Sequence, residues 1–333
     1  MTEIDLGDLY VDESRYAEAE TQLDAVMVKI RSAFGPNHPL VVRVLLSQAD
    51  LYKYQARYFE SERRYQQSLA ILKASAALDT LPRANALSSL GDLYLYMGRY
   101  QEAERALTSA LAIKEKMFGN DHLALAVVLH NLAALYGYLQ RYGEAETVHQ
   151  RVIMLQEQAL GPEHPALASS FNSIADVYRR QGRFPEAKHY FARCIAILER
   201  LPQPRKPLPS CLGGMAIILK NQGTYGEAER LQFQVLEIWR SLVGPKHPDF
   251  ALTQYNIARL YAAQDRNKEA EQWFRDALKN LEQALGPNHP RMSDAFEAYA
   301  EFLRQTNRED SAIFMDLRAK AIRAKSREAN PAN

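Results

Sequence analysis

Five histidines recur along the chain, each at the end of a short connector, and histidine is a common zinc ligand. The connectors belong to successive helical units. Neighbouring helices pack about 8 to 10 Å apart, whereas zinc binds each histidine at about 2.0 to 2.1 Å, so we predict no metal site. Each histidine is expected to pack or hydrogen-bond at the start of the following helix. The histidines are His38, His122, His164, His247 and His289, and the helices begin at Pro39, Leu123, Pro165, Pro248 and Pro290.

Paired glutamates recur at the start of alternate helices, as at Glu102 with Glu104 and at Glu144 with Glu146. Carboxylates can act as catalytic acid and base, but a catalytic pair has to be unique, and these pairs repeat. Negative charge near a helix N-terminus is favourable by itself. The sequence also has no glycine-rich phosphate loop, nucleophile elbow or His-Glu-x-x-His motif. We therefore predict that the protein is not an enzyme and has no catalytic residues and no cofactor.

The chain has 2 cysteines in 333 residues, too few for a disulfide scaffold. Cys194 stands in a column of small or aliphatic residues, and Cys211 follows one helix later, so the two can lie near each other. The other members of the column are Val26, Ser68, Ala110, Val152, Val235 and Ala277. Since neither cysteine has a Cys-x-x-Cys context, we expect buried, reduced thiols.

Charge is balanced, with 41 Lys and Arg against 40 Asp and Glu. Such a chain has no overall field that would gather nucleic acid or an acidic membrane. No apolar run approaches the roughly 18 residues of a membrane span. Met1 is followed by Thr-Glu-Ile-Asp rather than by a basic and then an apolar stretch, so no secretory signal is visible. We expect a cytoplasmic protein with no nucleic-acid partner and no membrane insertion.

The residues discussed above are positioned by a repeat of 42 residues, with one step of 41 between the fifth and sixth copies. A small residue marks the first helix of each copy, at Gly7, Ala49, Gly91, Ala133, Ala175, Ala216, Ala258 and Ala300. Another marks the second helix, at Ala19, Ser61, Ala103, Ala145, Ala187, Ala228, Ala270 and Ala312. Helices approach closely only where no large side chain intervenes, so the two columns predict eight helix pairs in one register.

An aromatic column follows three residues after the first small position, at Tyr10, Tyr52, Tyr94, Tyr136, Tyr178 and Tyr261, with Leu219 and Leu303 completing it. Leu90, Gly91, Tyr94 and Ala103 match the tetratricopeptide pattern, whose usual period is about 34 residues. The 42-residue form, with its Gly-Pro-x-His-Pro connectors, resembles the repeats of kinesin light chains and their bacterial relatives. The resemblance implies an all-α fold, a right-handed α-solenoid of about eight helix-turn-helix repeats.

A single solenoid is expected over residues 1–327, with a disordered tail at 328–333. The first repeat begins partway through its first helix, which indicates that residues upstream were removed. In repeats two to four an Arg-Tyr pair occupies the turn, and Tyr58, Tyr100 and Tyr142 are expected to begin the second helices. Between residues 201 and 209 a proline-rich segment replaces the regular connector. This segment either has no role or changes the local superhelical angle.

In this family the first helices form a concave groove, and the resemblance places fourteen residues of this chain there. They are Asp50, Tyr54, Asp92, Tyr96, His130, Asn131, Tyr138, Asn172, Asp176, Arg179, Arg180, Tyr255, Asn256 and Arg259. We expect the N-terminal half to be acidic with an aromatic ladder and the later part to be basic. The asparagine amides can hold the main chain of an extended peptide. As an alternative, the aspartates serve a structural pairing with nearby turn arginines.

The resemblance implies a noncatalytic scaffold or adaptor that binds a protein or peptide segment in the groove. In kinesin light chains the comparable asparagines touch cargo peptides. The Lys and Asn set with which chaperone-binding relatives hold a C-terminal carboxylate is missing, so that ligand is not predicted. The alternative is a sensor or regulatory region of a larger signalling protein whose effector domain lies upstream of residue 1. Self-association is left open.

Overall fold

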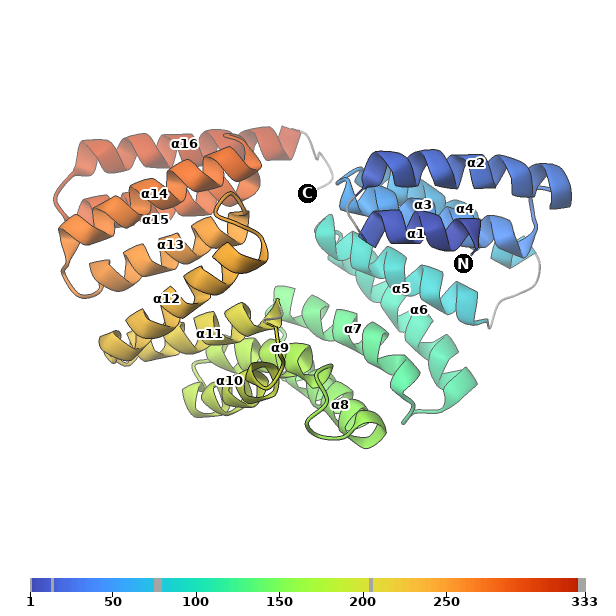
Figure 1. The fold of residues 1–333 in the computed structure, drawn as a ribbon, viewed down its shortest axis with the longest axis horizontal. Coiled ribbons are helices and arrows are strands. Elements are labelled where there is room, and N and C mark those ends of the chain that lie inside the picture. The colour runs from blue at the N-terminus through green and yellow to red at the C-terminus, as the bar shows by residue number, and fades with distance from the viewer. Residues whose placement is uncertain (1, 13–14, 75–79, 204–205, 329–333) are drawn as a thin grey trace. The chain divides into compact units, whose positions relative to one another are not determined.

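The computed structural model describes residues 2–12, 15–74, 80–203 and 206–328, and these contain sixteen α-helices, one short 3₁₀ helix and no strand. Each odd-numbered helix packs on the even-numbered helix that follows, which gives eight helix-turn-helix pairs (Figure 1). The predicted all-α solenoid repeat is therefore confirmed. Residues 329–333, most of the predicted tail, lie outside the described residues.

The helices fall into two compact units, which we describe separately. Unit one, Met1–Gly161, contains α1 (Glu3–Asp12), α2 (Tyr16–Phe34), α3 (Pro39–Tyr54), α4 (Tyr58–Ala74), α5 (Leu81–Tyr96), α6 (Tyr100–Phe118), η1 (Leu123–Leu125), α7 (Ala126–Tyr138) and α8 (Tyr142–Leu160). Unit two, Pro162–Asn333, contains α9 (Leu167–Arg180), α10 (Phe184–Glu199), α11 (Pro207–Asn221), α12 (Tyr225–Leu242), α13 (Pro248–Ala262), α14 (Asn267–Leu285), α15 (Pro290–Gln305) and α16 (Glu309–Glu328). One continuous solenoid over 1–327 remains a prediction.

The two columns of small residues lie where paired helices cross. Ala133 and Ala145 are fully buried, and a Cβ atom added at Gly91 would lie only 2.6 Å from Cγ of Leu107. The hydroxyl of Ser61 donates a hydrogen bond of 2.7 Å to the carbonyl oxygen of Ala49 across the same crossing in repeat two. Larger side chains would separate the helices, so the columns set the register as predicted.

Four of the five connector histidines are N-cap residues of helices, and His164 lies two residues before the N-cap of α9. In all five, Nδ1 accepts a hydrogen bond from the backbone N–H two residues later, at 3.0 Å for His122 and 3.3 Å for His38. These bonds satisfy donors that the first turn of a helix leaves without an intrahelical partner. The predicted role at helix starts is confirmed for His38, His247 and His289. His122 caps the 3₁₀ helix η1, which begins at Leu123, and α9 begins at Leu167 rather than at Pro165.

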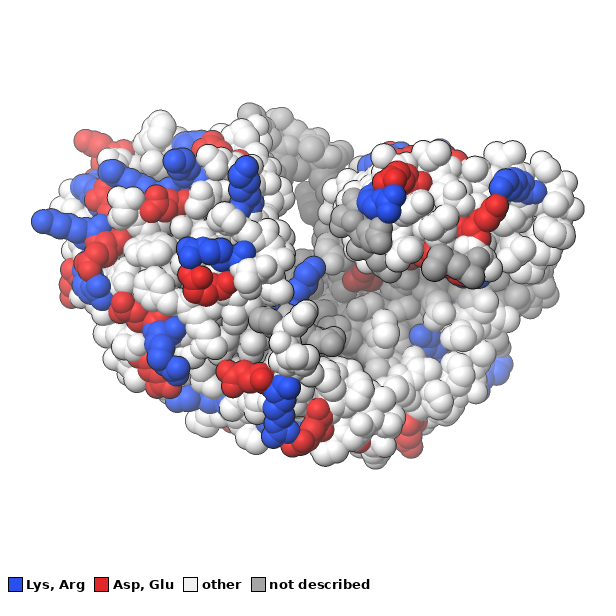
Figure 2. Space-filling view, in the orientation of Figure 1, with Lys and Arg blue, Asp and Glu red and all other residues white. Residues whose placement is uncertain are grey.

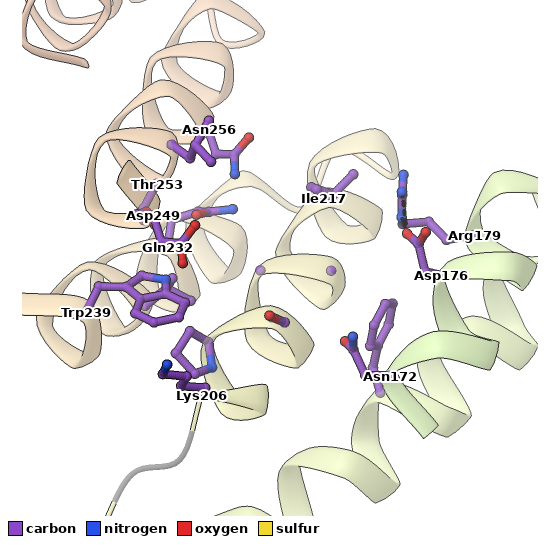
Figure 3. A pocket seen from close by; sticks show the side chains of 17 residues that line it. Asn172, Asp176, Arg179, Lys206, Ile217, Gln232, Trp239, Asp249, Thr253 and Asn256 are labelled. Carbon is purple, nitrogen blue, oxygen red and sulfur yellow. Dashed lines mark hydrogen bonds and ion pairs between the residues drawn. The ribbon is translucent and has the colours of Figure 1, made fainter. Parts of the chain in front are cut away.

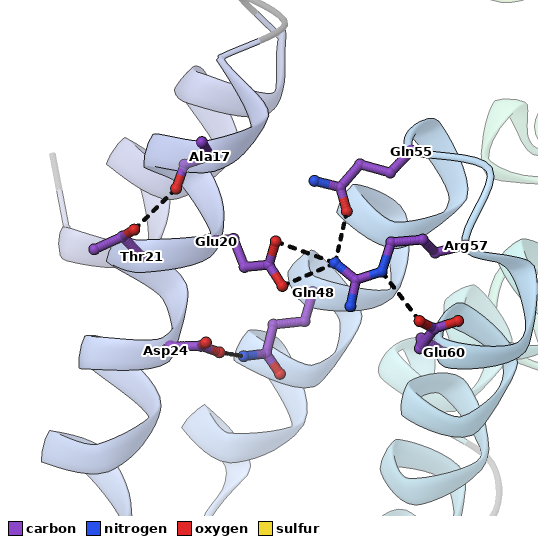
Figure 4. Close-up of polar contacts among 8 residues, drawn as sticks. All are labelled: Ala17, Glu20, Thr21, Asp24, Gln48, Gln55, Arg57 and Glu60. Carbon is purple, nitrogen blue, oxygen red and sulfur yellow. Dashed lines mark hydrogen bonds and ion pairs between the residues drawn. The ribbon is translucent and has the colours of Figure 1, made fainter.

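Turn arginines link consecutive repeats, a role that the Arg-Tyr pattern had not suggested. Arg57 lies 2.9 Å from Glu20 of the preceding repeat and 3.1 Å from Glu60 at the start of α4 (Figure 4). Its guanidinium also stacks 4.2 Å from the ring centre of Tyr52. The arrangement recurs at Arg99 with Glu62, Arg141 with Glu104 and Arg266 with Glu229. Tyr58, Tyr100 and Tyr142 begin α4, α6 and α8 as predicted.

Cys194 on α10 and Cys211 on α11 form a disulfide, which corrects the expectation of reduced thiols. The physical reason is the stacking of α10 on α11, which places the two fully buried side chains at the same level with Cα atoms 6.4 Å apart. The bond joins the two helices on either side of the irregular connector at 201–209. Residues 204–205 of this connector lie outside the described residues. Whether this connector changes the superhelical angle remains a prediction.

Charged side chains of both signs are spread over the visible helices of unit two. Figure 2 shows Lys and Arg side chains interspersed with Asp and Glu over the face of α12 to α16, in keeping with the balanced composition. Within the described part of the chain, no helix combines the length and the apolar character that crossing a bilayer requires.

Candidate functional site

Three exposed tyrosines mark unit one. Tyr54, Tyr96 and Tyr138 are the last residues of the first helices α3, α5 and α7, and they are 58%, 65% and 61% exposed. Because α3 contacts α5 and α5 contacts α7, the three rings stand on neighbouring helices. The ring of Tyr138 also stacks on Tyr100, with centroids 5.9 Å apart. We call these three residues the tyrosine stripe.

The predicted groove carboxylates Asp50 and Asp92 share one lysine. Nζ of Lys53 lies 3.0 Å from Oδ2 of Asp92 and 3.7 Å from Oδ1 of Asp50, and also 5.5 Å from the ring centre of Tyr54. The hydroxyl of Tyr65 donates a 2.5 Å hydrogen bond to Asp50. Burial raises the pKa of Asp50 above its usual range. The structural pairing of these aspartates thus involves Lys53 and Tyr65 rather than the turn arginines of the alternative.

His130 and Asn131 lie on α7, half-buried. The edge of the His130 ring meets His149 of α8, with centroids 5.6 Å apart, so this predicted groove residue contacts the helix pair's interior. Burial lowers the pKa of His130 and, together with the charge of His130, lowers the pKa of His149 to about 3. No hydrogen-bond partner of Asn131 is present among the described residues, which leaves its amide available.

A cavity of about 500 Å³ opens in unit two between α9, α11, α12 and α13 (Figure 3). Asn172, Asp176 and Arg179 come from α9 on one wall, and Asn256 of α13 comes from the opposite wall. We call this space the large cavity. Gly213 lines it without a side chain, and an added Cβ would meet nothing within 4 Å. The structure therefore brings four of the predicted groove residues to one cavity.

The charges of α9 are partly paired. Nε of Arg179 lies 2.9 Å from Oδ1 of Asp176, and Nε of Arg180 lies 2.6 Å from Oδ2 of the same residue. Burial opposes the charged form of Asp176, but the two arginines outweigh burial and hold its pKa below the usual range. Arg180 does not line the large cavity. Sγ of Cys211 lies 3.4 Å from Oδ1 of Asn172, so the disulfide borders this wall.

A second cavity of about 310 Å³ adjoins the first and shares Arg179, Gln232 and Asn256 with it. We call it the basic cavity, because Arg179, Lys220 and Arg259 line it and no carboxylate does. Arg259 also lies 5.8 Å from the ring centre of Tyr255.

Sequence reasoning missed three polar residues of the basic cavity, Lys220, Asn221 and Gln232. Gln232 occupies the core position of the second helix. This position is Asp316 in repeat eight and holds a large side chain in the other repeats, at Leu23, Tyr65, Leu107, His149, Phe191 and Phe274. A carboxamide in that column is visible in the sequence and could have indicated a polar site at this repeat. In the part of the chain that the structure describes, no group of three or more His, Cys, Asp or Glu side chains could hold a metal ion.

Comparison with known proteins identifies the repeats. The tetratricopeptide repeat model matches residues 1–74, 82–153, 137–200, 210–283 and 249–325. A search of the curated proteins finds no match. Among solved structures, tetratricopeptide-like repeats of a putative kinesin light chain from Podosopora anserina are 25% identical, covering 60% of this chain and 95% of that one with a TM-score of 0.52.

Two further structures share the fold over more of the chain. A tetratricopeptide repeat protein from Parabacteroides merdae is 18% identical, with 84% of this chain and 93% of that one covered and a TM-score of 0.60. The apo form of the quorum sensor NprR from B. thuringiensis is 13% identical. The match covers 96% of this chain and 86% of that one, with a TM-score of 0.76. At these identities the likeness establishes a common repeat fold and nothing about ligands.

Proposed function

The chain belongs to the tetratricopeptide repeat family, and from that premise we propose that it is a noncatalytic scaffold whose tyrosine stripe binds a protein segment carrying Lys or Arg side chains. The observation that supports this proposal is the exposure of Tyr54, Tyr96 and Tyr138 at one position of three successive repeats. The tyrosines of the aromatic column, in contrast, are largely buried, and the guanidinium groups of the turn arginines stack on their rings.

Tyrosine suits such a surface because its ring offers a large contact area while its hydroxyl stays hydrated. Aromatic residues are also enriched among those that contribute most to binding at interfaces. Three rings spaced along neighbouring helices favour an extended or helical segment over a compact small ligand.

The charge around the stripe favours a basic segment. Lys53 is the cation paired with both Asp50 and Asp92, and Asp8 on α1 adds a third carboxylate whose charge acts on Asp50. The position of Lys53 near Tyr54 also demonstrates how a cation can combine a ring face with a carboxylate. A lysine or arginine of the bound segment would repeat that arrangement on Tyr96.

A peptide selection on the full chain tests the proposal. We expect enriched peptides to carry Lys or Arg, and their binding to weaken with added salt, because charge complementarity is screened. The double variant Tyr96→Ala with Tyr138→Ala should lose these peptides while its unfolding transition stays unchanged.

The matched control is Val28→Ala with Phe59→Ala, which removes two exposed apolar side chains from the second helices α2 and α4 of the same unit. This variant should bind the selected peptides as the parent does. The proposal is wrong if the tyrosine double variant binds them equally well, or if the control variant loses them.

A further inference from the structure

The basic cavity of unit two is built from four helices. Arg179 comes from α9, Lys220 and Asn221 from α11, Gln232 from α12, and Asn256 with Arg259 from α13. Its volume of about 310 Å³ falls at the small end of the range of about 300 to 1,000 Å³ that is usual for small-molecule sites. Three cations and three carboxamides line it, with no carboxylate among the lining residues.

Two of the three cations have no ion pair among the described residues. Arg179 pairs with Asp176, but neither Lys220 nor Arg259 has a carboxylate within ion-pair distance. Lys220 is half-buried, and burial together with the charge of Arg259 lowers its pKa, while Glu301 of α15 acts in the opposite direction from an adjoining cavity. The surroundings of Lys220 therefore disfavour its charged form, and a bound anion would stabilise that form.

Gln232 supplies a second, independent indication of a ligand. Its side chain is 3% exposed, and its Oε1 has no hydrogen-bond partner in the described structure. A buried polar group without a partner destabilises the fold, and a leucine is found at this position in repeats one and three, as Leu23 and Leu107. Because rotation of a carboxamide exchanges its donor and acceptor ends, Gln232 can present a carbonyl oxygen to a donor in the cavity.

We propose that the basic cavity binds a compact oxyanion, a carboxylate or a phosphate, that carries a hydrogen-bond donor beside the charged group. Lys220 and Arg259 bind the anion, Asn221 and Asn256 offer amide donors to its oxygens, and the ligand's hydroxyl or N–H donates to Gln232. This chemistry is available to a free small molecule and to an acidic residue of a bound segment. The site shares no residue with the tyrosine stripe, so it goes beyond the proposed function.

Calorimetric titration of the full chain in low-salt buffer tests the site with four probes. Acetate offers a carboxylate alone, lactate adds a neighbouring hydroxyl, inorganic phosphate offers the other oxyanion, and N-acetyl-aspartate amide represents an acidic residue within a chain. We expect saturable binding, with lactate bound more tightly than acetate. Tighter binding of the blocked aspartate assigns the site to a segment, and tighter binding of lactate or phosphate assigns it to a free molecule.

Variants with matched controls locate the binding. Lys220→Met and Arg259→Leu should each weaken the probes by roughly tenfold or more, since each removes a charged hydrogen-bond donor. Lys279→Met on α14 and Arg230→Leu on α12 remove exposed cations away from the cavity and should leave affinity unchanged. Glu301→Gln should strengthen binding, because it removes the opposing carboxylate near Lys220 and Arg259.

Gln232→Leu should abolish the preference for lactate over acetate without unfolding the chain. Absence of saturable binding for all four probes, or unchanged affinity in the Lys220 and Arg259 variants, would overturn the site. A lactate preference that survives Gln232→Leu would overturn the role of Gln232. The Tyr96→Ala with Tyr138→Ala variant should bind the probes as the parent does. The experiments can therefore distinguish failure of the peptide-binding proposal from failure of the anion-site proposal.

Discussion

A guanidinium nitrogen of Arg99 lies 2.6 Å from Glu62 of the preceding repeat, and the hydroxyl of Tyr94 donates to the same carboxylate at 3.0 Å. The guanidinium also stacks 4.4 Å from the ring centre of Tyr94. One arginine thus joins a turn, an aromatic ring and the neighbouring repeat. A repeat array gains much of its stability from such contacts between neighbours.

Arg99→Met should destabilise unit one by about 2 kcal/mol, between the values for exposed and buried ion pairs. The Arg99 and Glu62 side chains are 22% and 12% exposed, whereas those of Arg141 and Glu104 in the next repeat are 38% and 34% exposed. Arg141→Met is therefore the matched control and should cost less. Urea unfolding midpoints measure the stability lost in each variant. An equal or greater loss of stability for Arg141→Met would contradict the argument.

His149 should make the fold sensitive to acid. Its pKa falls from 6.5 to about 3, because burial and His130 disfavour the charged form in the folded state. The unfolded chain therefore binds the proton more readily. The stability contributed by neutral His149 is fully present above about pH 6.5 and declines by up to about 1.4 kcal/mol for each pH unit below that, until about pH 3.

His149→Leu, which installs the residue found at Leu107, should reduce this decline between about pH 7 and about pH 5. Urea unfolding at the two pH values measures it. The exposed His189 is the control position, and His189→Leu should retain the parent's decline. An unchanged decline in His149→Leu would show that other groups govern the acid response.

Ala133→Leu should destabilise unit one by about 1 to 3 kcal/mol, because a large side chain at a close helix crossing overpacks the core. Gly137 on the same helix offers the control, since a Cβ there would meet nothing within 4 Å. Thermal unfolding of Ala133→Leu and Gly137→Leu compares a leucine placed at each of the two positions. Equal melting temperatures would show that the column of small residues does not set the register.

Loss of the Cys194–Cys211 bond should destabilise unit two by about 3 kcal/mol, the value expected for a loop of roughly this length. The bond spans 17 residues. Melting with and without a reducing agent measures the effect, and the Cys194→Ala with Cys211→Ala variant should show no response to the agent. Thiol titration of the unfolded, unreduced chain gives a direct check, because two free thiols would mean that the bond is absent.

Helix starts and the helix crossings were predictable because both depend on neighbours in the repeat. His38 caps α3 through a backbone N–H two residues away, and Gly91 meets Leu107 within one helix pair. The Arg99–Glu62 pair was not predictable from the Arg-Tyr pattern, since the partners are 37 residues apart and Glu60 lies at a comparable spacing.

The candidate site likewise contains residues that the sequence predicted and residues that it did not. Asn172, Asp176, Arg179 and Asn256 were predicted as groove residues and line the large cavity together. Gln232 was missed because it lies on a second helix, where the repeat pattern indicates core packing. The absence of a donor at its Oε1 becomes visible only when all the surrounding side chains are placed.

The amino-acid sequence alone determined the helix pairs, their register and the capped connectors, because a fixed repeat places equivalent residues in equivalent local surroundings. The tertiary structure decided which partners those residues take. Lys53 reaches Asp92 across 39 residues, and Cys194 reaches Cys211 across an irregular connector. Such pairings depend on distances of a few ångströms between side chains on different helices, and the repeat spacing specifies the helices without specifying those distances.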